Sequence, residues 1–228
     1  MSDDLDPRDV LPEKLHLYTG TAIDVTYDKA RCIHVGACIR AMPRVFDPGS
    51  RPWVMTGNGT ADRIAAAVEL CPSGSLKYLR KDGGPAEVPS AENAVLVSRS
   101  GPLFVRGQLE LVAADGTVKQ ETRLTLCRCG ASAHKPYCDN AHLKARFQDE
   151  GKRIPSTGLE AGQADASGPL RIEPEHDGPL QLGGNVRVLD ATGTVAGSTT
   201  EAAFCRCGHS GTKPFCDGSH ARTGFTSG

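Results

Sequence analysis

Residues 205–220 read Cys-Arg-Cys-Gly-His-Ser-Gly-Thr-Lys-Pro-Phe-Cys-Asp-Gly-Ser-His, and residues 127–142 read Cys-Arg-Cys-Gly-Ala-Ser-Ala-His-Lys-Pro-Tyr-Cys-Asp-Asn-Ala-His. Three Cys and one His recur in the same register, 78 positions apart (205 − 127). Three thiolates and one imidazole form a donor set for a metal. The spacing therefore predicts two metal sites, one made of Cys127, Cys129, Cys138 and His142, and one made of Cys205, Cys207, Cys216 and His220.

The cysteine count indicates reduced thiols rather than disulfides. The chain has 228 residues and nine cysteines, an odd number that excludes a complete disulfide set. Its first residues are acidic and show no export signal, so we expect a cytoplasmic protein with reduced thiolates. The formal net charge of −1 gives no indication of nucleic acid as a partner. No apolar run approaches the roughly 20 residues of a membrane span, so we expect no membrane association.

The segments before each Cys-rich stretch are also repeated. The glycine-bounded stretch 101–107 matches 178–184, and alternating apolar residues follow in both copies. Asp115-Gly116 and Thr192-Gly193 lie between the alternating segments and are typical of hairpin turns. Each copy is therefore predicted to be a hairpin, a Cys-rich loop and a short helix. We expect one module over 94–150, a linker over 151–169 and a second module over 170–228, arranged as a pseudo-twofold pair.

Two aspartates follow the third cysteine of each copy. Asp139 and Asp217 are predicted to be helix N-caps that accept the amide of the residue three positions on, His142 or His220. The free amides of the helix N-terminus would then face the metal site and favour its negative charge.

Basic residues in the loops permit two interpretations. Arg128 and Arg206, between the paired cysteines, and Lys135 and Lys213, before the prolines, either raise the reduction potential of a metal cluster or are solvated loop charges. The sequence leaves both open. The loop histidines His134 and His209 are expected to be exposed.

Two kinds of metal fit the donor set, a structural zinc ion and a [2Fe–2S] cluster. The string Cys-X-Cys-X₂-Ser-X₃-Pro-X-Cys-Asp-Gly-Ser-His at 205–220 resembles the CDGSH iron–sulfur family, the mitoNEET-like proteins, at every signature position. The resemblance implies a [2Fe–2S] cluster on the three Cys and the His of each copy. The first copy departs from the motif at Asn140 and Ala141, where the motif has Gly and Ser. With two motifs in one chain, the sequence resembles the soluble tandem members of that family.

The N-terminal part is predicted to be a separate small domain over 20–83, after an irregular arm over 1–19. Alternation over 23–27 predicts a strand, and alternation over 76–80 predicts a returning strand. Between them, 61–70 is predicted to be a helix capped by Thr60 and ended by Pro72. A Gly- and Pro-rich linker follows from residue 83.

The remaining cysteines lie in this domain. Cys32 and Cys38, followed by a distant Cys71-Pro72, resemble a single-cluster bacterial ferredoxin in which Val35 replaces the middle cysteine. The resemblance implies a [3Fe–4S] cluster, or a [4Fe–4S] cluster with a foreign fourth ligand, for which His34 is one candidate. The alternative is a domain that has lost its cluster and keeps these cysteines as small core residues.

The sequence as a whole predicts an α+β chain whose function is electron transfer between these clusters. A His ligand raises the potential of a cluster relative to all-Cys ligation. Because His ligates only when it is deprotonated, pH- or redox-triggered transfer or storage of clusters is an alternative. A second alternative is a zinc-stabilised protein-interaction module. We expect no catalytic residues, and a redox partner protein or cluster acceptor as the partner.

Overall fold

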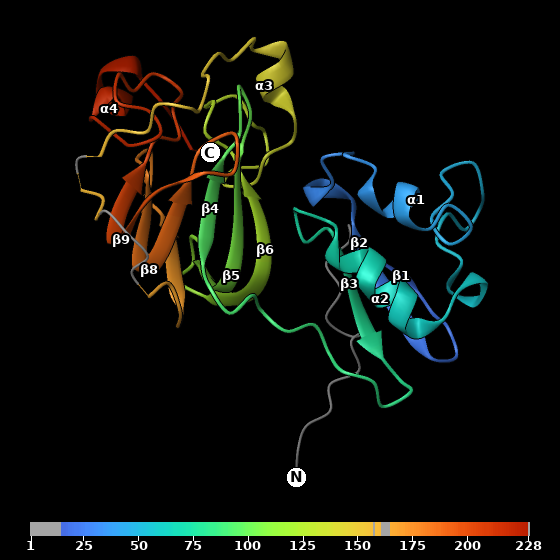
Figure 1. Ribbon diagram of the computed structural model, residues 1–228. Coiled ribbons are helices and arrows are strands. Elements are labelled where there is room, and N and C mark those ends of the chain that lie inside the picture. Colours follow the sequence, from blue (N-terminus) through green and yellow to red (C-terminus); the bar gives the residue numbers. More distant parts are fainter. Residues whose placement is uncertain (1–14, 157, 161–164, 228) are drawn as a thin grey trace. The chain divides into compact units, whose positions relative to one another are not determined.

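The computed structural model describes residues 15–156, 158–160 and 165–227 (Figure 1). The chain divides into two compact units, Met1–Glu87 and Val88–Gly228. The regular secondary structure of the described residues is mostly β-strand, with few helices. None of the helices in these residues is long and apolar enough to cross a membrane.

Unit 1 is a three-stranded antiparallel sheet with helices. The strand order is β1-β2-β3, and the longest helix, α2, packs against β3. The elements are β1 (Leu15–Tyr18), β2 (Ile23–Asp28), a 3₁₀ turn η2 (Lys29–Arg31), α1 (Ala37–Ala41), a 3₁₀ turn η3 (Thr56–Asn58), α2 (Ala61–Glu69) and β3 (Leu76–Arg80). The predicted strand, helix and returning strand are confirmed.

Three details of unit 1 differ from the prediction. Residues 15–18 belong to β1 and pair with β2, so this part of the expected irregular arm is a strand, while residues 1–14 lie outside the described part. The short helix α1 was not predicted. Thr60 stands at the N-cap of α2 with extended backbone, but its side chain makes no capping hydrogen bond.

The core of unit 1 forms between α2 and the sheet. Ile64 and Val68 of α2 are fully buried against Val25 of β2 and the loop residues Val45 and Phe46. Apolar residues four apart on a helix lie on one face, and α2 buries that face against the sheet. The segments at one end of the sheet are thereby held in place, and they carry the three cysteines of the unit: Cys32 and Cys71 in loops and Cys38 in α1.

Unit 2 holds the two repeats in one six-stranded sheet. The first repeat contributes β4 (Ala94–Val97), β5 (Leu103–Val112), β6 (Val118–Leu126) and α3 (Ala141–Lys144); the second contributes β7 (Leu170–Pro174), β8 (Leu180–Leu189), β9 (Val195–Phe204) and α4 (Ser219–Thr223). The hairpins β5–β6 and β8–β9 are antiparallel and turn at Gly116 and Gly193, both with positive φ. The predicted order of hairpin, Cys-rich loop and short helix is confirmed in both copies.

The repeats exchange strands across the sheet. The first strand of each repeat pairs antiparallel with the second strand of its own repeat and parallel with the second strand of the other: β4 pairs with β5 and β8, and β7 pairs with β8 and β5. Exchanging the two repeats leaves this set of pairings unchanged. Neither repeat therefore completes its sheet alone.

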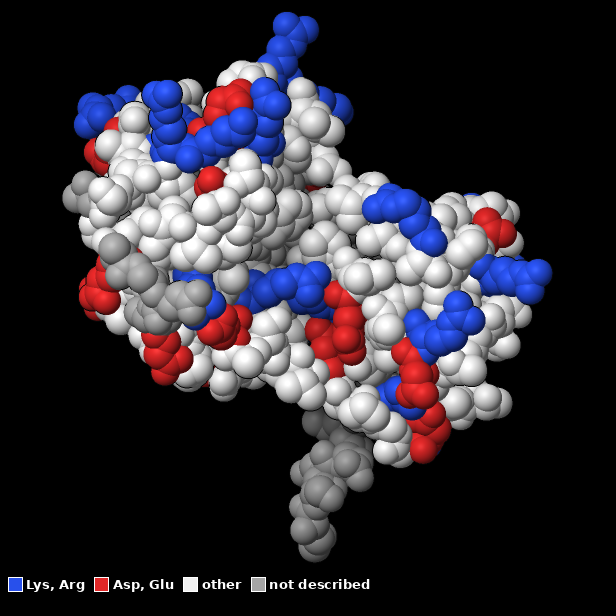
Figure 2. Space-filling model, in the orientation of Figure 1, with Lys and Arg blue, Asp and Glu red and all other residues white. Residues whose placement is uncertain are grey.

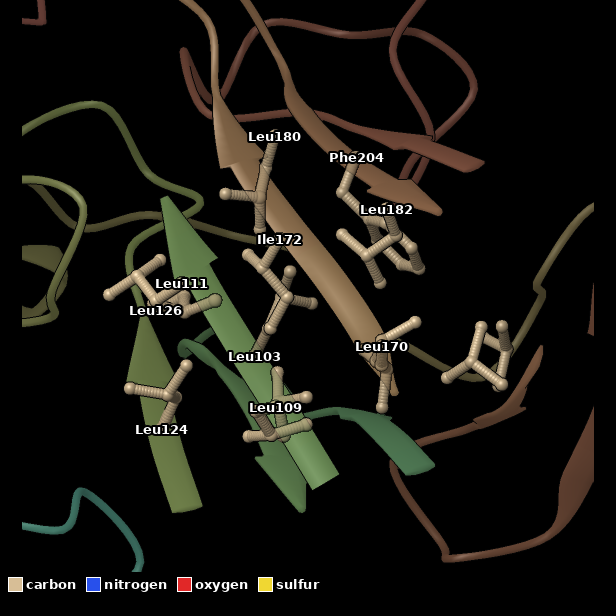
Figure 3. Packing of buried hydrophobic residues seen from close by; sticks show 14 of the residues in the cluster. Leu103, Leu109, Leu111, Leu124, Leu126, Leu170, Ile172, Leu180, Leu182 and Phe204 are labelled. Carbon is tan, nitrogen blue, oxygen red and sulfur yellow. The ribbon is translucent and has the colours of Figure 1, made fainter. Parts of the chain in front are cut away.

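One hydrophobic core serves both repeats (Figure 3). Side chains of β5 and β6, such as Leu109 and Leu126, point toward Leu170 and Ile172 of β7 and Leu182 of β8. The buried members of this cluster come from all six strands. Within the connection 151–169, Ile154 and Leu159 pack against the same core. Burial of this shared surface holds the repeats together.

Asn93 is the polar link between the repeats. It is 1% exposed, and its amide donates to the carbonyls of Gly168 (2.8 Å) and Asn185 (2.9 Å), while its side-chain oxygen accepts from Gln108 N–H (2.9 Å). A Cβ on Gly107 would lie 2.0 Å from that oxygen, and Gly107 has φ +142°. The glycine at this β-bulge therefore makes the room that Asn93 needs.

We expect Asn93→Ala to lower the free energy of unfolding of unit 2 by about 3 kcal/mol, because it leaves buried carbonyl and amide groups without a partner. Urea unfolding followed by circular dichroism measures this. Asn185→Ala is the control, since its exposed amide makes one contact at 3.5 Å. Equal losses for the two variants would contradict the role given to Asn93.

Candidate metal centres

The Cys-rich loops fold back onto the ends of the strands that precede them. In the first copy, Cys127 N–H donates to Pro136 O (2.8 Å) and Cys138 N–H donates to Thr125 O (2.9 Å). The same two bonds recur in the second copy, from Cys205 to Pro214 and from Cys216 to Ala203, both at 2.8 Å. These backbone bonds bring the third cysteine of each copy beside the first. Both loops lie at the end of unit 2 that carries α3 and α4 (Figure 1).

The ligands of each copy come as two close pairs. The Sγ atoms of Cys127 and Cys129 are 3.7 Å apart, and Cys138 Sγ lies 3.5 Å from His142 Nδ1. In the second copy the Cys205–Cys207 distance is 3.6 Å, and Cys216 Sγ to His220 Nδ1 is 3.3 Å. Two donors bound tetrahedrally to one ion at about 2.0–2.3 Å lie about 3.3–3.8 Å apart. Each pair therefore has the spacing of two ligands on one metal ion.

No group of three or more His, Cys, Asp or Glu side chains in the described part of the chain is arranged to hold a single metal ion. The donor atoms of each CDGSH-like loop instead form the two pairs described above. All nine cysteines are free thiols.

Backbone amides point at the sulfur atoms. Asn140 N–H donates to Cys138 Sγ and Gly218 N–H donates to Cys216 Sγ, both at 3.4 Å. Asn140 and Gly218 have left-handed backbone, with φ +69° and +82°. Asn adopts this conformation more readily than most residues, so the first copy keeps the loop shape without the Gly of the motif. Such amides stabilise negative charge on sulfur.

The prediction that Asp139 and Asp217 are helix N-caps is wrong: Asn140 and Gly218 stand at the N-caps of α3 and α4, and neither makes a side-chain capping bond. Asp139 accepts from Ala141 N–H and Ala133 N–H, both at 2.9 Å, and not from the amide of His142. Asp217 likewise accepts from Ser219 N–H (2.9 Å) and Gly211 N–H (2.8 Å). The left-handed residue after each Asp brings the amide two positions on within reach, as in an Asx-turn. Each carboxylate therefore ties the middle of its Cys-rich loop to the start of the short helix.

The local environment favours a neutral His and raises the cost of a free thiolate. Burial, together with the charge of Arg128, lowers the pKa of His142 below its usual value, although Asp139 opposes this. A neutral imidazole has the lone pair that a metal needs. Burial also raises the pKa of the Cys138 thiol to about 11. A bound cation would compensate the buried thiolate, so the site fits a metal group.

The two Cys-rich loops touch each other. A Cβ on Gly130 would lie 2.5 Å from the carbonyl oxygen of Cys207, and a Cβ on Gly208 would lie 2.7 Å from that of Cys129. Both glycines have positive φ, +81° and +83°. The contact is reciprocal, so the paired cysteines of the two sites are separated by a single layer of backbone.

Gly130→Ala is expected to destabilise unit 2 by about 3 kcal/mol or more, because the methyl group meets the backbone of the other loop. Gly116→Ala is the matched control: its φ is +83° with nothing within 4 Å of the added Cβ, so it carries only the left-handed strain of about 1–2 kcal/mol. Thermal unfolding of both variants separates strain from the clash. Equal changes in melting temperature would show that the loops do not touch.

The loop arginines are buried, so their interpretation as solvated charges is wrong. Arg128 is 2% exposed and Arg206 is 4% exposed. Both reach back to the loops between strands, where Arg128 Nε donates to Gly101 O (2.7 Å) and Arg206 Nε donates to Gly178 O (2.9 Å). Sequence spacing did not reveal these partners, because they lie 27 and 28 residues earlier in the chain.

The other basic and polar loop residues have ordinary roles. Lys135 and Lys213 donate to the carbonyls of Ser132 (2.8 Å) and Ser210 (2.6 Å) within their own loops. His134 and His209 are exposed, as predicted. The lysines stabilise their loops, the two histidines lie on the surface, and none of the four contributes a donor atom to the close pairs.

In unit 1 the three remaining cysteines surround one small cavity. Its volume is about 30 Å³, and Cys32, Cys38, Cys71 and the rings of Tyr27 and Trp53 line it. Burial raises the pKa of the Cys38 thiol to about 11, and the other two thiols add to this effect. The structure thus brings together the three cysteines predicted as one group.

His34 and Val35 lie at the edge of this cavity. His34 has positive φ, +54°, an unusual conformation for a non-Gly residue, and its Nδ1 lies 3.8 Å from Cys32 Sγ. Val35, at the position of the missing cysteine, is 41% exposed. His34 is thus beside a candidate ligand, and its role as a ligand stays a prediction.

Comparison with known proteins gives the family of each part. Residues 18–81 match the family described as a divergent 4Fe-4S mono-cluster, and residues 100–143 and 177–221 match the iron-binding zinc finger of CDGSH type. The chain belongs to these iron–sulfur families. The mono-cluster domain and the tandem CDGSH motifs coincide with unit 1 and unit 2, which confirms the resemblance drawn from the motifs.

Relatives of the mono-cluster domain include the uncharacterized protein YjdI of Escherichia coli K12. It is 38% identical over 64 residues, which are 28% of this chain and 84% of that protein. YjdI of E. coli O157:H7 matches to the same extent. No solved structure matches the chain.

Proposed function

We propose that this protein transfers electrons through two [2Fe–2S] clusters, one in each CDGSH loop. The pairing of the ligands carries the proposal. A [2Fe–2S] cluster takes two protein ligands on each iron, whereas a structural zinc ion takes all four at once. Donors grouped as a Cys–Cys pair and a Cys–His pair, each with the spacing of one ion, support the binuclear cluster over zinc.

The contact between the loops supports transfer from one cluster to the other. Cys129-Gly130 and Cys207-Gly208 pack against each other, so the two clusters would lie on either side of this backbone layer. The reciprocal strand pairing supports the pseudo-twofold arrangement that places them there. In unit 1, Cys32, Cys38 and Cys71 would hold a [3Fe–4S] or [4Fe–4S] cluster, which would give the protein three clusters. We assign no reaction and no catalytic residue.

The surface around the CDGSH sites supports an acidic redox partner. Lys and Arg side chains gather at the end of unit 2 that carries α3 and α4 (Figure 2). Exposed Lys144, Arg146 and Arg222 follow the His ligands, and Leu143, next to His142, is 70% exposed. A charged ring around an apolar contact steers a partner of opposite charge. The partner would thus dock beside His142 and His220.

Half-burial of the ligands favours a second candidate function, the transfer of whole clusters to an acceptor. His142, Cys216 and His220 are neither buried nor fully exposed. Protonating a His ligand would free one iron of the cluster at this surface. Spectroscopy of a ligand variant separates the two functions.

Analysis of anaerobically purified protein is expected to give two irons and two acid-labile sulfides for each CDGSH site, with further iron from unit 1. In the Cys38→Ser/Cys71→Ser variant only the iron of unit 1 should be lost. A colourless protein with about one zinc per CDGSH site would refute the proposal and support the interaction module.

His220→Cys is expected to lower the reduction potential of the second cluster and to slow its loss in acid, because a thiolate adds negative charge and has no imidazole to protonate. Visible absorbance during a pH titration and a redox titration measures both. His209→Cys, in the same loop but exposed, is the control. Unchanged acid lability in His220→Cys would remove His220 from the site. Cluster delivery to an apo acceptor that is faster than electron exchange would favour the second function.

A further inference from the structure

Arg128 and Arg206 occupy equivalent places in the two repeats. Arg128 donates to the carbonyls of Gly101 and Ser98, and Arg206 donates to those of Gly178 and Glu175. Each pair of acceptors is related by the same offset of 77 residues (178 − 101 and 175 − 98). The guanidinium groups lie over equivalent rings as well, Arg128 at 5.0 Å from the centre of Phe147 and Arg206 at 5.6 Å from that of Phe225.

The repeats differ in two respects at this place: an exposed carboxylate, Glu175, stands at the equivalent of Ser98 (98 + 77), and the carboxylate that contacts Arg128 has no charged equivalent. Asp149 forms an ion pair with Arg128, whose side chain is 1% exposed. The equivalent of Asp149 is Ser227 (149 + 78), which has no charge. Among the described residues, the side chain of Arg206 donates to the backbone carbonyls of Gly178 and Glu175.

A carboxylate is present in the second repeat, but at another position. Ser100 and Asp149 bind each other in the first repeat, where Asp149 N–H donates to Ser100 Oγ (3.2 Å). In the second repeat the types are exchanged: Ser227 N–H donates to the Asp177 carboxylate (2.6 Å), and Asp177 stands at the equivalent of Ser100 (100 + 77). The two repeats therefore carry the same hydrogen-bonded pair with Ser and Asp interchanged.

The exchange changes how well each arginine is neutralised. The Asp149 side chain is 18% exposed and in contact with its arginine, whereas Asp177 is 38% exposed and lies near His176. Water screens a carboxylate more strongly when it is exposed and separated from its partner. Arg128 is thus compensated by a contact ion pair. Arg206 interacts with the charges of Asp177 and Glu175, but among the described residues neither carboxylate forms a contact ion pair with it.

Both arginines lie close to the metal ligands. Each stands in the chain between the two paired cysteines of its own site, and each lies over the aromatic ring that follows the His ligand of that site by five residues. Arg206 also interacts with the charge of Cys127 in the first site. The first site, however, has the compensating Asp149 beside its own arginine, which the second lacks.

From these contacts we infer that the two CDGSH clusters have different reduction potentials, the second (Cys205, Cys207, Cys216 and His220) being the higher, and that Asp149 is the residue that separates them. This inference rests on the proposed function. Reduction adds one negative charge to a cluster, so a nearby buried cation without a contact ion pair favours the reduced form more than one that has such a pair. An electron that enters unit 2 therefore rests on the second cluster, and the first is the better donor.

Exchanging Ser and Asp within one repeat tests this at constant net charge. Ser100→Asp/Asp149→Ser gives the first repeat the arrangement of the second and should raise the reduction potential of the first cluster. Asp177→Ser/Ser227→Asp gives the second repeat the arrangement of the first and should lower the reduction potential of the second cluster. The test is a redox titration followed by visible and electron paramagnetic resonance spectra. In each double variant, the equilibrium constant for reduction of the altered cluster should change about tenfold, which for one electron is a shift of about 59 mV. Each double variant moves one step and leaves the other in place.

Two further variants complete the test. Asp149→Asn keeps the shape of the side chain and removes its charge. It should therefore raise the reduction potential of the first cluster, even if the double variants fold poorly. Glu150→Ser is the control, because Glu150 is 61% exposed, is paired with the exposed Arg99, and should not move either step.

Three outcomes would overturn the inference: a single reduction step in the wild type, shifts of the opposite sign, or a shift in Glu150→Ser as large as that in Asp149→Asn. A protein that contains both clusters but shows one of these results refutes the inference and leaves the proposed function standing. A protein without clusters refutes both.

Discussion

The exchange of strands between the two repeats is the constraint on which unit 2 depends. Because β4 pairs with β8 and β7 pairs with β5, neither repeat closes its sheet or its core alone. This pairing places both Cys-rich loops at one end of the sheet and brings the backbone at Cys129-Gly130 against that at Cys207-Gly208. The closeness of the two metal sites is thus a consequence of how the strands pair.

The chemistry of each site follows from the loop that the sheet presents. Backbone bonds at the strand end bring the third cysteine beside the first, and the Asx-turn at Asp139 or Asp217 ties the loop to the short helix. The result is two pairs of donors rather than one set of four. That arrangement matches an iron–sulfur group better than a single zinc ion.

Near-identical repeats need not give identical sites. The candidate ligands, the arginines and the two glycines where the loops touch are kept in both copies, and one difference beside the arginines is a Ser and an Asp that have changed places. The position of a carboxylate, rather than its presence, decides whether a buried arginine is neutralised, because contact and burial determine how strongly water screens the pair. A tandem chain can in this way distinguish two sites that two copies of one chain would keep equal.

Much of the site could be predicted from the sequence, because metal ligands are specified by residue type and spacing. The eight candidate ligands of the CDGSH motifs, the hairpins and the grouping of Cys32, Cys38 and Cys71 were all predicted in this way. The structure shows the hairpins, places the eight candidate ligands as close pairs and lines one cavity with the three cysteines of unit 1. The errors have physical reasons. Residues 15–18 were too few to show a pattern, although β2 offers them a pairing edge. The partner of Asp139 depended on the left-handed backbone of Asn140. Asn adopts both left- and right-handed backbone, so the residue type did not reveal this conformation.

The sequence by itself therefore determined which atoms can bind metal, since donor chemistry is a property of the residues. Tertiary structure alone decided which donor atoms lie close together as Cys–Cys and Cys–His pairs, and that the two loops touch. It also decided that Arg128 and Arg206 are both buried but differ in how nearby carboxylates compensate their charge. Those features arise from contacts between residues far apart in the chain, such as Arg128 with Asp149 and Gly130 with Cys207. No local pattern encodes such contacts, because they form only when the shared core and the exchanged strands bring the repeats together.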